Sequence, residues 1–548
     1  MAKEFKVTYL GTGTNSAGVR CAVLSIATKD RKPIKAVLPL VPVNGIEPET
    51  ILMDAVAALD VPLLTRKSRS QLLGLCEVAI KAAKEVQPAI IADAPGWLPN
   101  GQFLDPRGKL IGESEIPVGI CLHGVARPNR WKPKGTLKAF KEQASIFGEG
   151  NSTVIFCTAS ALAGPLLKVL GLEGVIFCFQ GPSSTGKTST LDFACSVVGG
   201  DPDHKQGFRS SWNTTDNAVE ALAYEGSDSL AAMDDTLLLS GRGSEKGQAL
   251  SNGIFSLTSG GEKRRLNARS SAVAPRIIGW SCSNYPLKDM LVKAGIPFGE
   301  MFSVRYIEIP VSWRHGMFET TGDMAPAEFS SALSQASRQN YGWAFRRFVR
   351  KLSESANLDP AGLEEYLSNA RQVVLHDMNL REDEKSGNRA ANYFALVYQA
   401  GCLAYRFRAL PWHPKIVRAA VLDCWKRHRE HLVQAAASSP MALLRDHIRK
   451  NVRTFATAGE DANLLEEEER HTQPGFLKAG TGGQPIEFMF TEDALRRILG
   501  SQDRIDLLVS ELRQAGFLIT SGGNSRPKRQ IADDWRPRVL CVSPRLLG

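Results

Sequence analysis

Residues 175–193 read VIFCFQGPSSTGKTSTLDF, and this stretch decides the fold of the middle of the chain. Its first part is a short run of β-branched and aromatic residues, which is typical of a buried parallel strand. A loop of small residues follows, and the next segment is helical in pattern until a Gly-Gly pair ends it. The loop fits G-x-x-x-x-G-K-[ST], with Gly181, Gly186, Lys187 and Thr188 in the fixed positions. The order strand, loop, helix predicts an α/β fold with an anion-binding loop at a helix N-terminus.

The residue types of this loop suit a nucleoside triphosphate. Several backbone N–H groups must point inward at the phosphates, and a side chain at Gly186 would block that approach. Lys187 would reach the β- and γ-phosphates of ATP, and the Thr188 hydroxyl would bind Mg²⁺. The alternative is an ordinary loop of small residues between a strand and a helix. The predicted cofactors are therefore ATP and Mg²⁺. The residues expected to contact the nucleotide are Gly181, Pro182, Ser183, Ser184, Thr185, Gly186, Lys187, Thr188 and Ser189.

Polar side chains follow two further apolar runs. In SLAAMDDTLLL, a short strand would deliver Asp234 and Asp235 to the same sheet edge as the loop. Asp234 would hold Mg²⁺ through water, and Asp235 would act as general base on the attacking water. The alternative is a simple turn, where adjacent acids are common. The next run, PRIIGWSCSN, ends at Asn284, whose amide would orient the lytic water, although an Asn-Tyr-Pro turn explains it equally well.

Two basic features lie farther along the chain. Arg305 precedes a strand in FGEMFSVRYIEIPV, where oligomeric ATPases place an arginine that enters the neighbouring subunit's nucleotide site. Arginines at strand entries are also common on ordinary surfaces. The segment GIFSLTSGGEKRRLNARSS has cations around a Gly-Gly pair, as in a hairpin that lines a ring's pore and binds single-stranded DNA. The alternative is a solvated loop. The cations are Lys263, Arg264, Arg265 and Arg269.

The composition favours a cytoplasmic protein with a polyanionic partner. The chain has 548 residues, of which 43% are hydrophobic, enough for roughly three or four domains. Its formal net charge of +10 suits a nucleic acid, although general solubility explains it too. The ten cysteines are scattered singly without zinc spacing, which predicts a reduced protein without a structural metal site. Neither a signal-peptide pattern nor an apolar stretch suited to a membrane is seen, so we expect a soluble protein.

The pattern along the chain predicts several domains. Residues 1–130 alternate short β-rich runs with helical stretches, as in a small α+β domain. Residues 131–315 hold the nucleotide loop within a three-layer α/β core. Residues 316–455 are mostly helical in pattern. The polar segment 456–485 is predicted to be a linker, and residues 486–548 are predicted to form a compact unit.

This C-terminal unit has the element order of a winged helix. Thr491 is the predicted N-cap of a first helix, a second helix covers 504–515, and FLIT starts a strand before a basic loop and the strand RVLCVS. In a winged helix the second helix usually enters the major groove of duplex DNA, and the loop contacts phosphates. A winged helix that serves only protein contacts is the alternative. The loop cations are Arg526, Lys528 and Arg529.

Several of these stretches together resemble a known family. Residues 135–310 are similar to the bacterial ATPases described as a domain of unknown function, found in phages, plasmids and other mobile elements. The staphylococcal cassette replicative helicases belong to that family. The resemblance continues through YGWAFRRFVRKL and GNRAANYFALVYQAGCLAYRFRALPW, and it is weaker over 1–130. The other matching stretches are GNSTVIFCTASALAGPLLKVLG, the nucleotide loop, SWNTTDNAVEALA, the MDDT and SGGEKRR segments and GEMFSVRYIEIPV.

The resemblance implies an AAA+-like core with a helical lid, similar to the MCM helicases. It also implies a homo-oligomeric ring, a hexamer, that moves along DNA. Arg389 falls where the family has an arginine on its lid, which implies a second sensor of the γ-phosphate. The family usually has Asp-Glu where this chain has Asp234 and Asp235. Because aspartate is one methylene shorter, we expect the attacking water to be held less well.

The leading hypothesis is an ATP-dependent replicative DNA helicase of a mobile element, with priming by a separate primase. A second hypothesis is a DNA-binding ATPase that does not unwind, acting as a loader, a regulator or a defence switch. A third is a soluble phosphotransferase, which would leave the basic hairpin and the winged-helix unit unexplained.

Overall fold

The computed structural model describes residues 5–28, 31–42, 47–48, 50, 52–53, 66–83, 85–122, 128–200, 207–239, 244–259, 275–311, 315–380, 385–480 and 484–547. The chain divides into two compact units. Unit 1 comprises residues 1–239, 252–284 and 300–426, and unit 2 comprises residues 240–251, 285–299 and 427–548. The structure therefore has fewer divisions than the sequence pattern predicted.

Within its described residues, unit 1 is built on a five-stranded parallel sheet. The strand order is β10-β11-β12-β9-β13, with β9 at Val175–Gln180, β10 at Ser210–Ser211, β11 at Ser229–Asp234, β12 at Ile277–Ser283 and β13 at Tyr306–Pro310. The long strands are almost entirely buried, as expected for a parallel sheet that is covered on both faces. Because all strands run the same way, their carboxyl ends share one edge. The predicted α/β class with a parallel sheet is confirmed.

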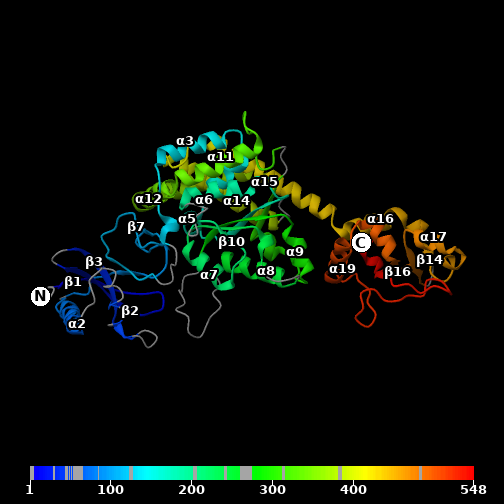
Figure 1. Ribbon diagram of the computed structural model, residues 1–548, viewed down its shortest axis with the longest axis horizontal. Helices are drawn as coiled ribbons and strands as arrows, with labels where there is room; N and C mark the ends of the chain where they lie inside the picture. The colour runs from blue at the N-terminus through cyan, green and yellow to red at the C-terminus, as the bar shows by residue number, and fades with distance from the viewer. Residues whose placement is uncertain are drawn as a thin grey trace. The chain divides into compact units, whose positions relative to one another are not determined.

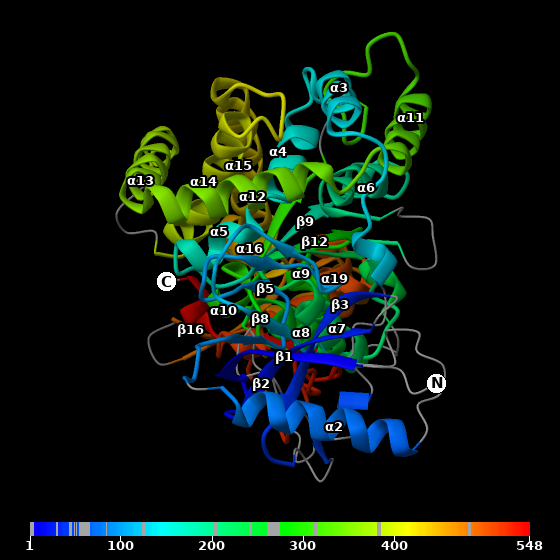
Figure 2. The ribbon, with the colours of Figure 1, turned by 90° about the vertical axis from the view of Figure 1, so that its left-hand side faces the viewer.

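Helices cover this sheet on both sides (Figure 1). In Figure 2, α4 (Ser152–Ser160), α12 (Trp343–Leu358) and α14 (Lys385–Arg406) lie on one side of β9 and β12, and α7 (Asp216–Glu225) lies on the other. Aromatic side chains join the layers. The ring of Phe177 on β9 is 5.2 Å from that of Phe156 on α4 and 5.7 Å from that of Phe394 on α14. The sheet and these helices therefore form one packed core.

The helices predicted as a lid belong to that same core. They include α11 (Pro326–Gln339), α13 (Pro360–Asp377) and α15 (Pro414–Ala437) besides α12 and α14. Apolar residues of α11 to α15 form one continuous cluster with those of the sheet. An amphipathic pattern shows that a helix buries one face, but it does not identify the element that the face packs against. The sequence therefore predicted the helices. The prediction of a separate helical region at 316–455 is corrected, because these helices share one core with the sheet.

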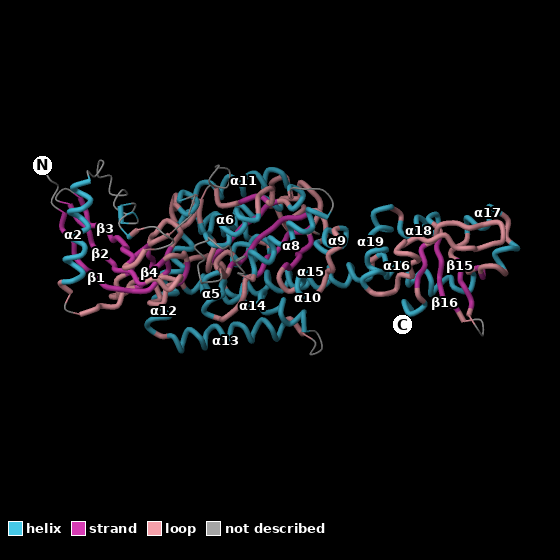
Figure 3. The backbone as a smooth tube through the Cα atoms, turned by 90° about the horizontal axis from the view of Figure 1, so that it is seen from below, coloured by secondary structure: helices cyan, strands magenta, loops and turns pink. Residues whose placement is uncertain are grey.

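The N-terminal part starts with an antiparallel sheet, and Figure 3 shows α2 (Arg66–Lys81) beside it. A small sheet, β5-β6-β7, packs farther on against α12. There the rings of Phe103 and Phe345 are 5.5 Å apart, and Arg346 donates to Asp105 at 2.9 Å. No boundary falls at residue 130, because this small sheet packs on the core. The strands are β1 (Phe5–Thr14), β2 (Arg20–Thr28), β3 (Arg31–Pro39), β4 (Ile90–Ala92), β5 (Gly96–Trp97), β6 (Phe103–Leu104), β7 (Leu110–Ile111) and β8 (Val118–Ile120).

In unit 2, three helices share a core with a sheet ordered β14-β15-β16-β17. Thr491 caps α18 as predicted, since its hydroxyl accepts the Ala494 N–H at 3.2 Å. The predicted FLIT strand is replaced by an isolated bridge between Leu518 and Val542. The helices are α16 (Pro440–Asn451), α18 (Glu492–Leu499) and α19 (Gln502–Gln514), and the last two strands are β16 (Pro485–Phe490) and β17 (Leu540–Val542).

The structure corrects the predicted linker at 456–485. This segment forms β14 (Ala456–Thr457), α17 (Glu467–Thr472) and β15 (Phe476–Ala479), and β15 pairs antiparallel with β16. Its polar composition hid short strands, since β14 pairs with β15 inside the segment and β15 pairs with β16, which follows it closely. The remaining elements are η1 (Pro128–Trp131), α3 (Leu137–Gly148), α5 (Gly164–Val169), α6 (Lys187–Val198), η2 (Thr236–Leu238), α8 (Ser244–Thr258), α9 (Leu287–Lys293), α10 (Glu300–Ser303), η3 (Val452–Thr454), η4 (Asp461–Leu464) and η5 (Pro544–Leu547). Among the described residues, no helix has both the length and the apolar character that a membrane crossing needs.

Candidate functional site

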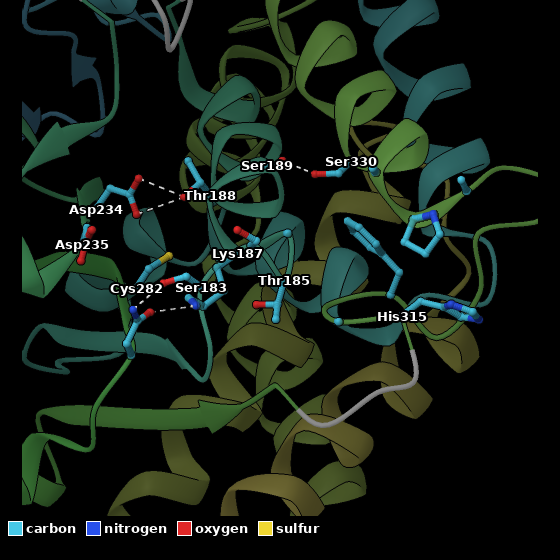
Figure 4. A pocket seen from close by; sticks show the side chains of 18 residues that line it. Ser183, Thr185, Lys187, Thr188, Ser189, Asp234, Asp235, Cys282, His315 and Ser330 are labelled. Atoms are coloured by element: carbon cyan, nitrogen blue, oxygen red, sulfur yellow. Dashed lines mark hydrogen bonds between the residues drawn. The ribbon is translucent and has the colours of Figure 1, made fainter.

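A pocket of about 800 Å³ lies in unit 1, at the carboxyl edge of the parallel sheet (Figure 4). Three parts of the chain line it: the loop between β9 and α6, the ends of β11 and β12, and the segment 315–330. The first two parts contribute Ser183, Ser184, Thr185, Gly186, Lys187, Thr188, Ser189, Asp234, Asp235, Cys282 and Asn284. Most of the residues predicted for the nucleotide site are therefore neighbours in space, because the strands that precede them end at one edge.

The 181–188 loop has an unusual backbone. Ser184 and Gly186 have positive φ angles of 60° and 90°. A Cβ atom added at Gly186 would lie 2.9 Å from ring atoms of the buried Phe318. The backbone N–H of Met317 also donates to the Thr185 carbonyl oxygen at 2.7 Å. The glycine at 186 is thus required by the packing of a distant segment against the loop, a reason that differs from the one the sequence suggested.

The Lys187 side chain folds back onto this loop and is almost fully buried. Its ammonium group donates to the Gly181 carbonyl oxygen at 2.7 Å, to the Pro182 carbonyl oxygen, and to Asn284 Oδ1 at 3.2 Å. Burial lowers the pKa of this ammonium, and nearby acidic groups oppose that shift. A buried cation with carbonyl and amide oxygens as partners would gain free energy from an anionic oxygen in the pocket.

Thr188 and Asp234 face each other across the gap between α6 and β11. The Thr188 hydroxyl donates to Asp234 Oδ2 at 3.1 Å. Figure 4 shows Asp235 beside Asp234. Asp235 follows the strand with a positive φ of 54°, so the chain turns sharply after the acidic pair. A hydroxyl and a carboxylate are oxygen ligands of the kind that Mg²⁺ prefers, so Thr188 and Asp234 would be able to hold this ion beside a phosphate.

Asn284 connects the end of β12 to the loop. Its Nδ2 donates to Ser183 Oγ at 2.6 Å, while its Oδ1 accepts from Lys187. The sequence left open whether Asn284 belongs to a site or only to a turn. The structure places it in the pocket wall, hydrogen-bonded to two residues of the nucleotide loop.

Two charged residues beside the acidic pair escaped the sequence analysis. Arg209 Nη1 lies 2.8 Å from Asp234 Oδ2, and Arg209 Nε lies 2.6 Å from Asp192 Oδ1. Arg209 immediately precedes β10, which pairs with β11. Its role could have been suspected only from the strand order, because neither Arg209 nor Asp192 belongs to a recognisable motif.

The segment 315–330 also escaped the sequence analysis, although it forms the wall opposite the acidic pair. Figure 4 shows His315 on the far side of the pocket from Asp234. The hydroxyl groups of Ser189 and Ser330 are 2.6 Å apart and link α6 to α11. This wall consists of His315, Gly316, Phe318, Ala325, Pro326, Ala327 and Ser330. It is mostly apolar and lacks a motif that sequence patterns would detect.

Arg305 and Arg389 are not brought to the pocket. Arg305 precedes β13, and its carbonyl oxygen accepts from Ile176 at the start of β9, so it lies at the opposite sheet edge. Its guanidinium lies 3.3 Å from Glu173, and that of Arg389 lies 3.6 Å from Glu300. The pKa of Tyr393 is raised to about 12, mainly by burial and also by Glu173, while Arg305 and Arg389 oppose the shift. The two arginines therefore lie near one another.

The predicted DNA-binding cations form two groups, and the structure describes only the group in unit 2. Lys263, Arg264, Arg265 and Arg269 lie outside the described residues. In unit 2, Arg526 lies 3.5 Å from Asp506 and 3.8 Å from Glu492, and Arg529 lies 3.1 Å from Glu487. Lys528 is exposed. Two of the three loop cations thus already have carboxylate partners within their own unit.

The donor set of the pocket fits ATP with Mg²⁺. The left-handed glycine, the buried ammonium of Lys187 and the paired oxygens of Thr188 and Asp234 meet at one edge of the sheet. The loop also lies at the N-terminus of α6, where the helix dipole favours anions. Such a pocket at the carboxyl ends of parallel strands is the common ligand position in open α/β folds.

Fold and site together define an α/β protein with a polar pocket at the carboxyl edge of a parallel sheet. Residues 48–275 match the family model described as "Domain of unknown function (DUF927)", a range that holds the loop and the acidic pair. The chain is also similar to a solved structure described as "SCCmec type IV Cch - active helicase". The identity is 15% and the TM-score 0.60, covering 99% of this chain and 94% of that chain. The match over residues 48–275 confirms the resemblance to the domain-of-unknown-function family, and the likeness to the solved structure shows a shared fold.

A second solved structure, "The A form apo structure of NrS-1 C terminal region-CTR", matches at 12% identity with a TM-score of 0.26. It covers 74% of this chain and 90% of that chain, and a TM-score at this level defines no shared fold. No curated protein matches the chain.

Proposed function

We propose that this protein is an ATP-dependent DNA helicase or translocase of a mobile genetic element, built on an AAA+-like P-loop core. The observation that carries the proposal is the convergence of Lys187, Thr188, Asp234 and Asn284 on one pocket. The similarity of the fold to that of a solved helicase supports it. The net charge of +10 is in keeping with a nucleic-acid partner.

The two ends of the pocket suit the two ends of ATP. The triphosphate binds at the end that holds Lys187, Thr188 and Asp234, where a cation and metal ligands are available. The ribose and base bind against the apolar segment 315–330, where Ala325 and Ala327 line the wall. This orientation follows from charge, because a buried ammonium favours the anionic end of the ligand.

Each residue then has a defined task in hydrolysis. Lys187 exchanges its carbonyl partners for oxygens of the β- and γ-phosphates. Thr188 and Asp234 hold Mg²⁺, which neutralises charge on the phosphates when it is bound. Asn284 orients the attacking water, and Asp235 accepts its proton.

We propose that Arg305 acts on the nucleotide of a neighbouring subunit in a homo-oligomeric ring, a hexamer. A strand of six residues separates Arg305 from the pocket, which corresponds to roughly 20 Å at the usual rise per residue. This separation is too great for contact within one chain. Arg389 lies at the same edge, so its predicted role as a γ-phosphate sensor also requires the neighbour's site.

DNA binding is assigned to two regions. The segment with Lys263, Arg264, Arg265 and Arg269 supplies the cations that follow one strand through the pore. Unit 2 is a winged helix that binds duplex DNA through phosphate contacts, with Lys528 as the accessible cation of its loop. A separate primase supplies primers.

A forked-duplex assay with ATP tests the proposal. We expect strand separation by the wild type and its loss in Lys187→Ala. The triple variant Lys263→Ala, Arg264→Ala, Arg265→Ala should keep ATP hydrolysis and lose strand separation, because only the cations proposed to bind the DNA strand are removed. DNA-stimulated hydrolysis without a displaced strand would instead favour a loader, a regulator or a defence switch. Absence of ATP binding would overturn the proposal as a whole.

A further inference from the structure

We propose that Arg209 is a positioning residue that holds Asp234 in place for Mg²⁺, with Asp192 as its anchor. The inference rests on the function proposed above. It gives a role to Arg209 and Asp192, which belong to none of the predicted motifs and pair with the predicted Asp234. The role is to set how much Mg²⁺ the nucleotide site needs.

The network is a series of four side chains, Thr188, Asp234, Arg209 and Asp192, whose two ends both lie on α6. Thr188 and Asp192 are four residues apart on α6, so they project from the same face of the helix. Arg209 donates to Asp192 and to Asp234, at 2.6 Å and 2.8 Å. Thr188 donates to the same Asp234 oxygen, Oδ2, at 3.1 Å. Arg209 thereby connects Asp234, at the end of β11, to Asp192 on α6, the helix that follows the nucleotide loop.

Arg209 reaches Asp234 from outside the pocket. Asp234 belongs to the pocket lining, whereas Arg209 does not belong to the described residues that form it. Both Arg209 and Thr188 contact Oδ2. The contact of Thr188 with Oδ1 is longer, at 3.5 Å, so Oδ1 is the oxygen better placed to accept from a metal-bound water. The guanidinium therefore orients the carboxylate without blocking the metal position.

Removal of Arg209 has two opposing effects on Mg²⁺ affinity. Loss of a positive charge close to the metal would strengthen Mg²⁺ binding. Loss of the tether would let the Asp234 carboxylate rotate and would leave two buried carboxylates without their cation. We expect the loss of carboxylate orientation to outweigh the loss of charge repulsion, so that Mg²⁺ affinity falls. Partners of metal-ligating carboxylates typically contribute roughly tenfold or more to metal affinity. Burial alone would lower the pKa of Arg209, but Asp192 and Asp234 raise it, so the guanidinium stays charged.

The test is the binding of a fluorescent ATP analogue to the full chain, titrated with Mg²⁺. We expect Arg209→Gln to need roughly tenfold more Mg²⁺ for half-maximal binding, by analogy with other partners of metal ligands. Binding in the presence of EDTA should stay at the wild-type level, because Lys187 and the loop are unchanged. Arg209→Lys keeps the charge but cannot contact Asp192 and Asp234 with two separate nitrogens. Its Mg²⁺ requirement should therefore lie between those of the wild type and Arg209→Gln. Asp192→Asn should move in the same direction as Arg209→Gln.

A matched control is Arg107→Gln, which breaks an arginine–aspartate pair outside the pocket lining. Arg107 lies 2.8 Å from the buried Asp105. This variant should leave the Mg²⁺ requirement unchanged. An unchanged or lower requirement in Arg209→Gln and Arg209→Lys, with wild-type circular dichroism, would overturn the positioning role. A wild type that binds no nucleotide at any Mg²⁺ concentration would instead overturn the proposed function.

Discussion

Gly186 couples the shape of the nucleotide loop to Phe318, a residue far away in the sequence. Its φ of 90° is costly for any residue with a Cβ atom, and that atom would lie 2.9 Å from the Phe318 ring. Left-handed backbone costs a non-glycine residue about 1–2 kcal/mol. Overpacking of a buried ring adds roughly 1–3 kcal/mol. The same position is thus constrained twice.

We predict that Gly186→Ala lowers the free energy of unfolding by about 2–5 kcal/mol, the sum of backbone strain and overpacking. It should also weaken ATP binding, because the loop must shift. Gly171→Ala is the matched control, since Gly171 has a φ of 65° and nothing within 4 Å of its added Cβ. Urea denaturation should show the smaller, strain-only loss for Gly171→Ala. Equal losses in the two variants would contradict the role of Phe318.

At the scale of single residues, the sequence predicted those that belong to a motif. Lys187, Thr188 and Asp234 follow from loop chemistry and from a strand that ends in an acid. Arg209 could not be predicted, because its role depends on β10 lying next to β11, a neighbour relation that no local pattern contains. Phe318 could not be predicted for the same reason.

Elements are joined in unit 1 by a buried carboxylate, Asp228, in the turn before β11. Its Oδ2 accepts the Trp97 N–H at 3.0 Å, and the Trp97 indole donates to the Pro165 carbonyl oxygen at 2.8 Å. Burial raises the pKa of Asp228 above its ordinary value, and the Trp97 N–H and nearby cations oppose that shift. The contact holds the small sheet β5-β6-β7 to the core at the cost of a buried charge.

We predict that Asp228→Asn keeps the contact and changes the pH dependence of stability. The raised pKa means that the folded wild type holds its proton more tightly than the unfolded chain, so wild-type stability rises as pH falls through the raised value. Asparagine does not titrate, so the variant lacks this contribution to the pH dependence of stability. The unfolding free energy of the variant relative to wild type should therefore be greatest near pH 7 and shrink toward pH 4 or so, near the unfolded pKa of about 3.9. A pH-independent difference would contradict the burial of a charged Asp228.

Elements with strong local signals were predicted well, whereas short polar strands and the packing partners of the helices were not. β9 and α6 have an apolar run and a Gly-Gly stop, and their bounds match the prediction closely. β14 and β15 were predicted as a linker because they are short and partly polar, and their stability comes from the pairing of β14 with β15 and of β15 with β16. The apolar helices of 316–455 were found, but their fusion with the sheet was not, because helix periodicity does not identify a partner.

At the scale of the whole molecule, the proposal requires a ring in which one chain completes the site of the next. Arg305 and Arg389 lie together at the sheet edge opposite the pocket, with Glu173 and Glu300 as their partners in the free chain. In each pair at least one side chain is largely exposed to solvent, so the ion pair contributes little to stability. Each arginine can therefore leave its carboxylate partner and bind a phosphate at a small cost in free energy.

We predict that Arg305→Ala and Lys187→Ala are each inactive in ATP hydrolysis but complement one another when mixed. With random assembly at equal amounts, about a quarter of the interfaces combine an intact Lys187 with an intact Arg305 from the next subunit. Hydrolysis should recover to a comparable fraction of the wild-type rate. Arg389→Ala mixed with Lys187→Ala should behave in the same way. No recovery in either mixture would contradict action between subunits.

In the proposed function, the 181–188 loop and the acidic pair hold one triphosphate and its metal between them. Electron paramagnetic resonance with Mn²⁺ in place of Mg²⁺ tests it most directly, because phosphate groups bound to the metal produce phosphorus hyperfine coupling. We predict this coupling for Mn²⁺ that stays bound to the wild type with ATP after unbound nucleotide and metal are removed, and its loss in both Lys187→Ala and Asp234→Ala. Bound Mn²⁺ without phosphorus coupling, or coupling that survives both substitutions, would contradict the account.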